Sequence, residues 1–261
     1  MSESKPLAAV EFEVHGNVAL LTINRQEARN AVNGDVANAM EAAIDRLEAD
    51  DALWVGIVAG AGPVFCAGAD LKAVASGRGA EISTKRGGFG GIARRERNKP
   101  LIAAVDGAAL AGGCEIALSC DLIVASTQAS FGIPEVKRSL IAGAGGLFRL
   151  PRALPRNLAL ELAMTGDPIT AERAYHFGMV NELCEPGQTV ARAMVLAARI
   201  SANAPLAVQA SRRVVLGAAQ ASDDDAWRLT AAEFAPVVQT EDYKEGPRAF
   251  IEKRPPQWKG R

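Results

Sequence analysis

The chain has 261 residues, of which 49% are hydrophobic and 23% are charged, and its formal net charge is −1 at pH 7. A chain of this length and apolar content can bury a sizeable core as one large domain. The balanced charge gives no overall attraction to nucleic acid or to a membrane surface, so an anionic ligand must be bound by local groups. No apolar run reaches the roughly 18 residues that a membrane span requires.

Cysteine and histidine usage excludes several kinds of site. The four cysteines have no CxxC spacing, and no basic start with an apolar signal segment precedes the first predicted strand, so we expect reduced thiols and a cytoplasmic protein. His15 and His176 lie near no cluster of Cys or acidic residues, which leaves little material for a metal site or a Ser-His-Asp triad. GxGxxG after a strand and GK[ST] are both missing, so no nicotinamide or nucleoside triphosphate is expected.

The first half of the chain alternates predicted strands with helices. Residues 9–24 alternate in polarity around Gly16-Asn17, which predicts a hairpin. Apolar residues at helical spacing predict a helix over 36–50, with Asp35 as its N-cap. Buried strands are predicted over 53–60, 101–107 and 121–126, and a helical turn over 114–120. This alternation indicates a layered α/β fold built of strand–strand–helix units.

From about residue 155 the pattern becomes helical. Helices are predicted over 156–166, 170–178, 189–204, 205–220 and 223–238. Only residues 179–184 are strand-like in this part of the chain. By themselves these helices are expected to cap their own core.

Three glycine-rich turns border apolar runs, GAGPVFCAGAD at 60–70, LAGGCE at 110–115 and IAGAGG at 141–146. Glu115 comes directly after the second turn, and Glu135 follows Pro134 just past the strand-like ASFGI. A Glu taken at random is an ordinary solvated residue about nine times in ten. Carboxylates at the ends of elements are nevertheless where acid–base catalysts collect, so both are candidates.

In order and spacing these motifs resemble the enoyl-CoA hydratase (crotonase) superfamily, from NRQEARNA at 24–31 to EGPRAFIEKRPPQW at 245–258. The resemblance implies a crotonase (ClpP-like) spiral of repeated β-β-α units over residues 1–204, followed by a C-terminal helical oligomerisation region over 205–261. In relatives this region forms trimers that stack as a dimer of trimers, so it implies a homo-hexamer. No internal sequence repeat is visible, so the spiral is implied by the resemblance alone.

The resemblance also implies an activity. A hydratase of this family adds water reversibly to a 2-trans-enoyl-CoA and forms a 3-hydroxyacyl-CoA, as in fatty acid β-oxidation; coenzyme A is only the carrier of the substrate, and no metal or other cofactor is expected. By resemblance, the backbone N–H groups of Ala69 and Gly112 stabilise the enolate oxygen. Glu115 orients and deprotonates the water, and Glu135 exchanges the α-proton. Relatives with other chemistries often change one or both acids, so the pair favours hydration.

Binding of the CoA moiety is expected to use several further positions. Residues matching Ala28, Ala67, Asp70 and Leu71 surround the adenine and the upper pantetheine in relatives. Phe250 and Lys253 match tail positions that reach the CoA of a neighbouring subunit, although helix packing explains Phe250 about equally well. Arg25 and Arg29 lie near enough in sequence to meet phosphate groups.

Two alternatives remain open. The tail also resembles crotonobetainyl-CoA hydratases (carnitinyl-CoA dehydratases), but two Tyr and three Trp give little material for an aromatic cage around a trimethylammonium group. The basic, glycine-rich segment 75–99 reads as a mobile solvated loop, as a lid over the acyl pocket, or as an RNA-binding surface. Its one aromatic residue, Phe89, offers little for base stacking. Ala142 stands where relatives commonly have Pro, which leaves the preferred acyl-chain length open.

Overall fold

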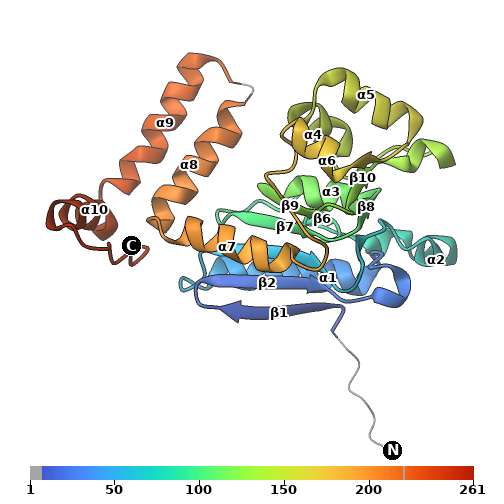
Figure 1. Cartoon of the computed structure of the whole chain (residues 1–261), viewed down its shortest axis with the longest axis horizontal. Helices are drawn as coiled ribbons and strands as arrows, with labels where there is room; N and C mark the ends of the chain where they lie inside the picture. The colour runs from blue at the N-terminus through green and yellow to red at the C-terminus, as the bar shows by residue number, and fades with distance from the viewer. Residues whose placement is uncertain (1–7, 220) are drawn as a thin grey trace, which may run out of the picture.

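The structure is a computed structural model that describes residues 8–219 and 221–261, with two stacked sheets and flanking helices (Figure 1). The larger sheet has the strand order β1-β2-β3-β7-β9-β12. Its hairpin β1–β2 is antiparallel, and every other pair is parallel. Its strands are β1 (Val10–His15), β2 (Val18–Ile23), β3 (Val55–Gly60), β7 (Leu101–Val105), β9 (Leu122–Ser126) and β12 (Glu182–Cys184).

The second sheet is smaller and carries the site described below. Its order is β11-β10-β8-β4, in which β4, β8 and β10 run parallel and β11 runs antiparallel to β10. The strands are β4 (Val64–Cys66), β8 (Ala108–Leu110), β10 (Ser130–Gly132) and β11 (Ile169–Thr170). A separate short hairpin pairs β5 (Ser83–Thr84) with β6 (Gly88–Phe89).

Helices follow the strands and cover the sheets. Those of the first half are η1 (Gln26–Ala28), α1 (Gly34–Ala49), α2 (Leu71–Ala73), η2 (Val74–Arg78), η3 (Gly79–Ile82), α3 (Gly112–Ser119) and η4 (Pro134–Arg138). Those of the second half are α4 (Gly146–Ala153), α5 (Arg156–Thr165), α6 (Ala171–His176), α7 (Thr189–Ser201), α8 (Pro205–Ala218), α9 (Asp223–Val237) and α10 (Glu241–Glu252). Seven of these helices match the predicted ones within a few residues, namely α1, α3, α5, α6, α7, α8 and α9. The short helices η1, α2, η2, η3 and η4 and the longer α10 were not predicted. α4 was not predicted, because its sequence follows a glycine-rich turn and contains Pro151.

Helix α1 shows how the apolar pattern is used. Val36, Met40, Ile44 and Leu47 are fully buried along one face, as their helical spacing predicts. The predicted N-cap is wrong, since the side chain of Asn33 accepts the Val36 N–H at 3.0 Å. Asp35 instead lies in the first turn, where a negative charge interacts favourably with the helix dipole.

Two apolar clusters hold the layers together. The larger cluster fills the space between the two sheets, α1 and α3, and contains Phe65 and Phe131 with no exposed surface. The smaller cluster lies on the other face of the large sheet, where Ala193 and Ala197 of α7 pack against its strands. Strands of the large sheet are thus covered on both faces, which explains their continuous apolar sequences.

The basic segment 75–99 is attached to α1 and is not the loose solvated loop that was one of the three possibilities left open by the sequence. Glu41, Asp45 and Glu48 recur at positions i, i+4 and i+7 of that helix and face the segment. Asp45 pairs with Arg86 and Arg95, each at 2.5 Å. The carboxylates of Glu41 and Glu48 accept backbone N–H groups at 2.8 to 2.9 Å. Three acids of one helix face therefore fix the course of this segment.

The C-terminal helices leave the core. Figure 1 shows α8 and α9 as an antiparallel pair that extends away from the two sheets, with α10 at the far end of the molecule from α2. The tail folds back, because the Asp242 carboxylate accepts the N–H groups of Lys259 and Gly260 at 2.7 and 2.9 Å. The predicted division of the chain at residue 204 stays a prediction. Within the described residues, no helix has the length and apolar character needed to cross a membrane.

Candidate active site

Three neighbouring strands deliver the candidate catalytic groups to one edge of the small sheet. β4 leads through Gly68 to Ala69, β8 leads through Ala111 to Gly112 and Glu115, and β10 leads to Glu135. Because these strands are adjacent and parallel, their carboxyl ends meet at the same edge. Residues that are up to 66 positions apart in the sequence therefore converge.

A cavity of about 680 Å³ opens at this edge. Ala69, Gly112, Glu115 and Glu135 all line it, together with Phe89 and other apolar residues. The remaining apolar lining comes from Ala67, Leu71, Ile82, Leu110, Ala111, Pro134, Leu140, Ile141 and Ala144. The size is that of a site for a small organic molecule, and the mixture of apolar walls with a few polar groups is typical of one.

Glu115 is buried and firmly held. Only 3% of the residue is exposed, and its Oε1 accepts the N–H groups of Ala144 and Gly146 at 2.7 and 2.8 Å. Burial raises the pKa of the Glu115 carboxyl, and the negative charge of Glu135 raises it further. The two N–H donors and the guanidinium of Arg149 act in the opposite direction, because they favour the ionised form.

Glu135 is placed differently. It lies in the first turn of η4 and is half-buried, and its Oε2 is buried without a hydrogen-bond partner among the described residues. Burial raises the pKa of this carboxyl, while its own backbone N–H and Arg138 lower it. An unpartnered carboxyl oxygen at a cavity wall is costly for the ionised form and is suited to a neutral carboxyl or to a ligand.

The backbone at Ala69 and Gly112 presents two N–H groups. Residue Val32 pairs with the neighbours of Ala69 on both sides: its N–H donates to the Gly68 carbonyl and its carbonyl accepts the Asp70 N–H, each at 2.8 Å. The N–H of Ala69 itself takes no part in this pairing. Gly112 is the first residue of α3, where N–H groups have no intrahelical acceptor. Among the described residues, neither N–H has an acceptor in the protein.

The turns that carry these N–H groups are conformationally demanding. Gly68 has φ +96°, and a Cβ at this position would lie 2.8 Å from the Ala111 Cβ and 3.1 Å from the Gly112 nitrogen. Ala111 itself adopts φ 52° and ψ −129°, a strained conformation for a residue other than glycine. The two turns are therefore in direct contact and hold the two N–H groups close together.

The residues expected at the CoA moiety are only partly brought to the cavity. Ala67 and Leu71 line it and Ala28, in η1, does not. Asp70 also lies outside the lining, because its carboxylate caps α2 through the N–H groups of residues 72 and 73 and pairs with Arg25 at 3.1 Å. Arg25 is therefore engaged within the chain rather than free for a phosphate.

Phe250 and Lys253 lie far from this cavity in their own chain. Phe250 is 84% exposed on α10, and Lys253 is the residue that ends this helix, with φ 54°. Figure 1 places α10 at the opposite end of the molecule from α2. Neither residue lines the cavity of its own chain, and their expected contact with the CoA of a neighbouring subunit stays a prediction.

The cysteines and acidic residues do not form a metal site within residues 8–219 and 221–261. Cys66 and Cys114 are buried beside the site, and burial raises the pKa of the Cys66 thiol to about 12. The Cys66 sulfur accepts the Gly68 N–H at 3.4 Å. It therefore supports the turn at Ala69 as a neutral group.

Comparison with known proteins identifies the family. The sequence model described as "Enoyl-CoA hydratase/isomerase" matches residues 13–261. The chain belongs to this family. It is an enzyme of the crotonase superfamily, with the α/β fold and helical C-terminal region that the resemblance implied.

Individual members of the enoyl-CoA hydratase/isomerase family match the whole chain. The enoyl-CoA hydratase EchA19 of Mycobacterium tuberculosis is 41% identical over 265 residues, which cover 99% of this chain and 98% of that protein. A carnitinyl-CoA dehydratase of Proteus mirabilis is 36% identical over 259 residues, with 97% and 99% coverage. A crystal structure of an enoyl-CoA hydratase from Mycobacterium tuberculosis superposes with a TM-score of 0.94 at 46% identity and covers 98% of this chain and 100% of that one.

Several residues at this family site were not foreseen. Ala144 and Gly146 hold Glu115, and Arg149 binds the carbonyl oxygen of Ala144 at 3.0 Å. The glycine-rich stretch at 141–146 was a visible signal of a special turn, but nothing in it indicated which carboxylate it binds. Arg138 also lines the cavity, and so does Arg94, which belongs to the segment 75–99 that was one candidate for a lid over the acyl pocket.

Proposed function

We propose that this protein catalyses the reversible hydration of a 2-trans-enoyl-CoA to a 3-hydroxyacyl-CoA. The observation that carries the proposal is that one cavity is lined by two glutamates and by Ala69 and Gly112, whose backbone N–H groups have no acceptor among the described residues. Enoyl-CoA hydratases that match the chain over nearly their full length support the same reaction. The route needs only groups that the chain and the acyl-CoA supply.

In the proposed mechanism the thioester oxygen lies between the N–H groups of Ala69 and Gly112. Addition of water places negative charge on this oxygen as an enolate forms, so donors that are already aligned lower the barrier. Gly112 also begins α3, whose dipole presents partial positive charge at this end. The thioester must enter beside Phe89, because the ring lies 2.3 Å from the position of a Cβ on Gly112.

The two glutamates then divide the proton transfers. Glu115 acts as the base that orients and deprotonates water, since two N–H donors favour its ionised form. Glu135 delivers a proton to the α-carbon, since its unpartnered buried oxygen favours the neutral form. Environments that separate the pKa values of two carboxyls are the usual basis for such a division.

A direct assay tests this proposal. The purified protein should hydrate crotonyl-CoA, which is followed by the loss of absorbance of the conjugated thioester, and in deuterium oxide the product should carry one deuterium at the α-carbon. The double variant Glu115→Gln/Glu135→Gln is the control for contaminating hydratase. Wild-type activity no higher than that of the double variant on short, medium and long 2-enoyl-CoAs would refute hydration.

Carnitinyl-CoA dehydration is the second candidate, because relatives of that name also match the chain over its length. The charges of the cavity argue against it. Apart from the two glutamates, the charged lining residues are Arg29, Arg94 and Arg138, and Phe89 is the aromatic one. A trimethylammonium group would meet three guanidinium groups and a single ring. We therefore expect a higher kcat/KM for crotonyl-CoA than for crotonobetainyl-CoA, and the reverse ranking would favour the second candidate.

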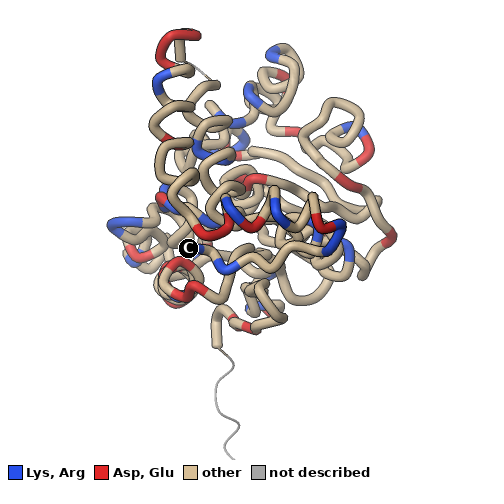
Figure 2. Tube along the Cα trace, turned by 90° about the vertical axis from the view of Figure 1, so that its left-hand side faces the viewer, with Lys and Arg blue, Asp and Glu red and all other residues tan. Residues whose placement is uncertain are grey.

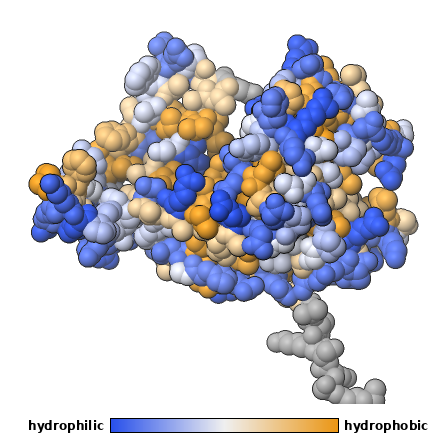
Figure 3. Space-filling view, viewed as in Figure 1, coloured by the Kyte–Doolittle hydropathy of each residue, from blue (hydrophilic) through white to orange (hydrophobic). Residues whose placement is uncertain are grey.

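We also propose that the protein assembles as a hexamer, a dimer of trimers. Apolar side chains are exposed on the C-terminal helices, and Figure 3 shows hydrophobic residues gathered along this arm and in the hollow beside it. They include Val215 and Leu216 of α8, Trp227 and Phe234 of α9, and Phe250 and Ile251 of α10, with 56% to 84% of each residue exposed. Exposed apolar surface of this extent is typical of a subunit interface.

A further inference from the structure

We propose that Arg149 is a positioning residue for Glu115: it fixes the loop whose N–H groups hold the Glu115 carboxylate, and its charge favours the ionised carboxylate. The inference rests on the proposed role of Glu115 as the base for hydration. Arg149 lies at the start of α4, on the side of the loop away from the substrate cavity, and does not line that cavity. It therefore acts through Glu115 and not on the substrate.

Both polar groups of Ala144 are used in this arrangement. Its N–H donates to Glu115 Oε1 at 2.7 Å, and its carbonyl accepts from Arg149 Nη1 at 3.0 Å. The peptide groups of this one residue thus connect the guanidinium to the carboxylate. A rotation of the loop that breaks one bond would also misalign the other.

The other end of the guanidinium is anchored to a different part of the chain. Arg149 Nη2 donates to the carbonyl of Ala93 at 2.7 Å, and Ala93 belongs to the segment that α1 holds through its acidic face. Gly145, with φ +109°, leaves room for the bond from Arg149 Nη1 to the Ala144 carbonyl, because a Cβ there would lie 2.2 Å from Nη1. The loop is therefore shaped around the arginine, and the arginine ties it to a fixed neighbour.

The charge of Arg149 is not neutralised by a partner. Its hydrogen bonds go to two carbonyl groups, and among the described residues no carboxylate forms an ion pair with it. Burial lowers its pKa, although an arginine stays protonated at any pH of interest. Among the charged groups of the described residues, Glu135 opposes the ionisation of Glu115 most and Arg149 favours it most. Arg149 is thus the cation that offsets part of the cost of burying a negative charge at Glu115.

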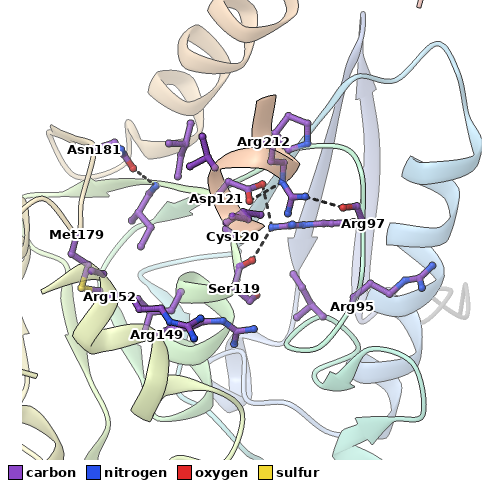
Figure 4. A pocket seen from close by; sticks show the side chains of 18 of the residues that line it. Arg95, Arg97, Ser119, Cys120, Asp121, Arg149, Arg152, Met179, Asn181 and Arg212 are labelled. Atoms are coloured by element: carbon purple, nitrogen blue, oxygen red, sulfur yellow. Dashed lines mark hydrogen bonds and ion pairs between the residues drawn. The ribbon is translucent and has the colours of Figure 1, made fainter. Parts of the chain in front are cut away.

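The surroundings of Arg149 suggest a sharp experiment. Behind the loop lies a second cavity of about 730 Å³, and Figure 4 shows Arg149 and Arg152 low in it, below the cluster of Asp121 with Arg97 and Arg212. Besides Glu115, the ionisable groups around Arg149 are Arg97, Arg152 and Cys120. The cavity opens the space left by a truncated Arg149 to a small solute such as guanidinium, at a concentration high enough to offset repulsion by Arg97 and Arg152. Arg152 is a matched control, because its guanidinium lies 5.1 Å from the centre of the Phe148 ring and that of Arg149 lies 5.0 Å from it. Unlike Arg149, Arg152 makes no hydrogen bond to the loop among the described residues.

The test compares Arg149→Ala, Arg149→Lys and Arg152→Ala in steady-state hydration of crotonyl-CoA. Arg149→Ala should lower kcat by roughly 10 to 100-fold while KM changes by less than about threefold. The acid limb of its pH–rate profile should move to higher pH, because loss of the cation raises the pKa of the base. Added guanidinium should restore part of kcat in this variant alone. Arg149→Lys should keep the acid limb near that of the wild type, and Arg152→Ala should behave as wild type.

Two results would overturn the proposal: an Arg149→Ala enzyme with unchanged kcat and pH profile, or a loss of activity with an unmoved acid limb and no guanidinium rescue. If Arg149→Ala does not fold, the pH–rate profile of Arg149→Lys decides, since a shifted acid limb in this charge-conserving variant contradicts the electrostatic role.

An infrared pH titration of the Glu115 carboxyl tests the proposal without turnover. The carboxyl band is assigned by its absence in Glu115→Gln. A raised titration midpoint in Arg149→Ala supports the proposal even if wild-type protein fails to hydrate crotonyl-CoA, and an unchanged midpoint refutes it.

Discussion

Glu115 and Glu135 line one cavity, but only Glu115 has a carboxylate oxygen bound by two backbone N–H groups, whereas Glu135 has a buried oxygen with no partner among the described residues. Burial raises the pKa of both carboxyls. The two N–H donors favour the ionised form of Glu115, whereas an oxygen with no partner among the described residues disfavours the ionised form of Glu135. This asymmetry is the physical basis for assigning one as base and the other as acid.

The first prediction concerns this pair. Glu115→Gln and Glu135→Gln should each lower kcat for hydration by roughly 10² or more, since each removes one proton-transfer group. The double variant should lose less than the product of the two losses, because the groups act on one substrate in one step. Calorimetry should show that acyl-CoA binding largely survives. Glu135→Gln with activity within a few-fold of wild type would contradict the two-acid assignment.

The second prediction concerns stability and pH. A carboxyl with a raised folded-state pKa contributes stability that is complete below its unfolded-state pKa and is lost as pH rises through the folded-state pKa. Glu135 should therefore destabilise the fold at neutral pH, and Glu135→Gln should raise Tm there by about 2 to 4 °C for each kcal/mol recovered. The gain should vanish below about pH 4. Thermal unfolding from about pH 3 to 8 measures this gain in Tm. A variant that is equally or less stable than wild type throughout would exclude this effect.

The third prediction separates an enzyme from an RNA-binding protein. Arg94 lines the cavity, whereas Arg86 pairs with Glu41 and Asp45 of α1, so Arg94→Gln should change KM for acyl-CoA and Arg86→Gln should not. Figure 2 shows basic and acidic residues interspersed along the chain in that view. Filter binding at several salt concentrations should therefore detect no tight RNA complex. Sub-micromolar, salt-sensitive RNA binding would support the rival function.

The fourth prediction tests whether neighbouring subunits share a site. If Phe250 and Lys253 reach the CoA of a neighbour, the variant Phe250→Ala/Lys253→Ala should have a raised KM for acyl-CoA. The variant Glu115→Gln lacks the catalytic base but keeps an intact tail, so each variant has the part that the other lacks. Co-expression of the two variants should restore activity to about a quarter of the wild-type level, because mixed oligomers regenerate sites with both parts intact. No recovery in verified mixed oligomers would contradict a shared site.

The fifth prediction concerns assembly. Deletion of residues 245–261 should weaken CoA binding and loosen the oligomer together, because the tail is part of α10 and of the clasp formed by Asp242. Thermal stability of the intact protein should depend on protein concentration, as expected for linked folding and association. Light scattering that reports a fully active 27.3 kDa monomer would refute both the hexamer and the shared site.

Local sequence was enough to predict most elements and the principal candidates for catalysis. The apolar spacing of α1 and the alternation around Gly16 depend on neighbouring residues only, so the helix and the hairpin could be predicted. Glu115 and Glu135 could be singled out because a glycine pair and a proline stand beside them. The N-cap of α1 could not be decided, since Asn33 and Asp35 are both good capping residues and only the backbone conformation selects Asn33.

Tertiary structure decided what the candidates can do. The parallel pairing of β4, β8 and β10 joins Ala69, Gly112 and Glu135 at one sheet edge, and such pairing depends on contacts between distant residues that no local spacing encodes. The Asp70 carboxylate pairs with Arg25, 45 residues earlier in the chain, a contact that no local spacing indicated, and its expected place beside CoA stays a prediction. Arg149 reads in sequence as one more surface arginine. Only the folded loop brings Arg149 to Ala144, the residue whose N–H binds Glu115. A buried charge needs hydrogen-bond partners, and the fold decides which backbone groups lie near enough to provide them.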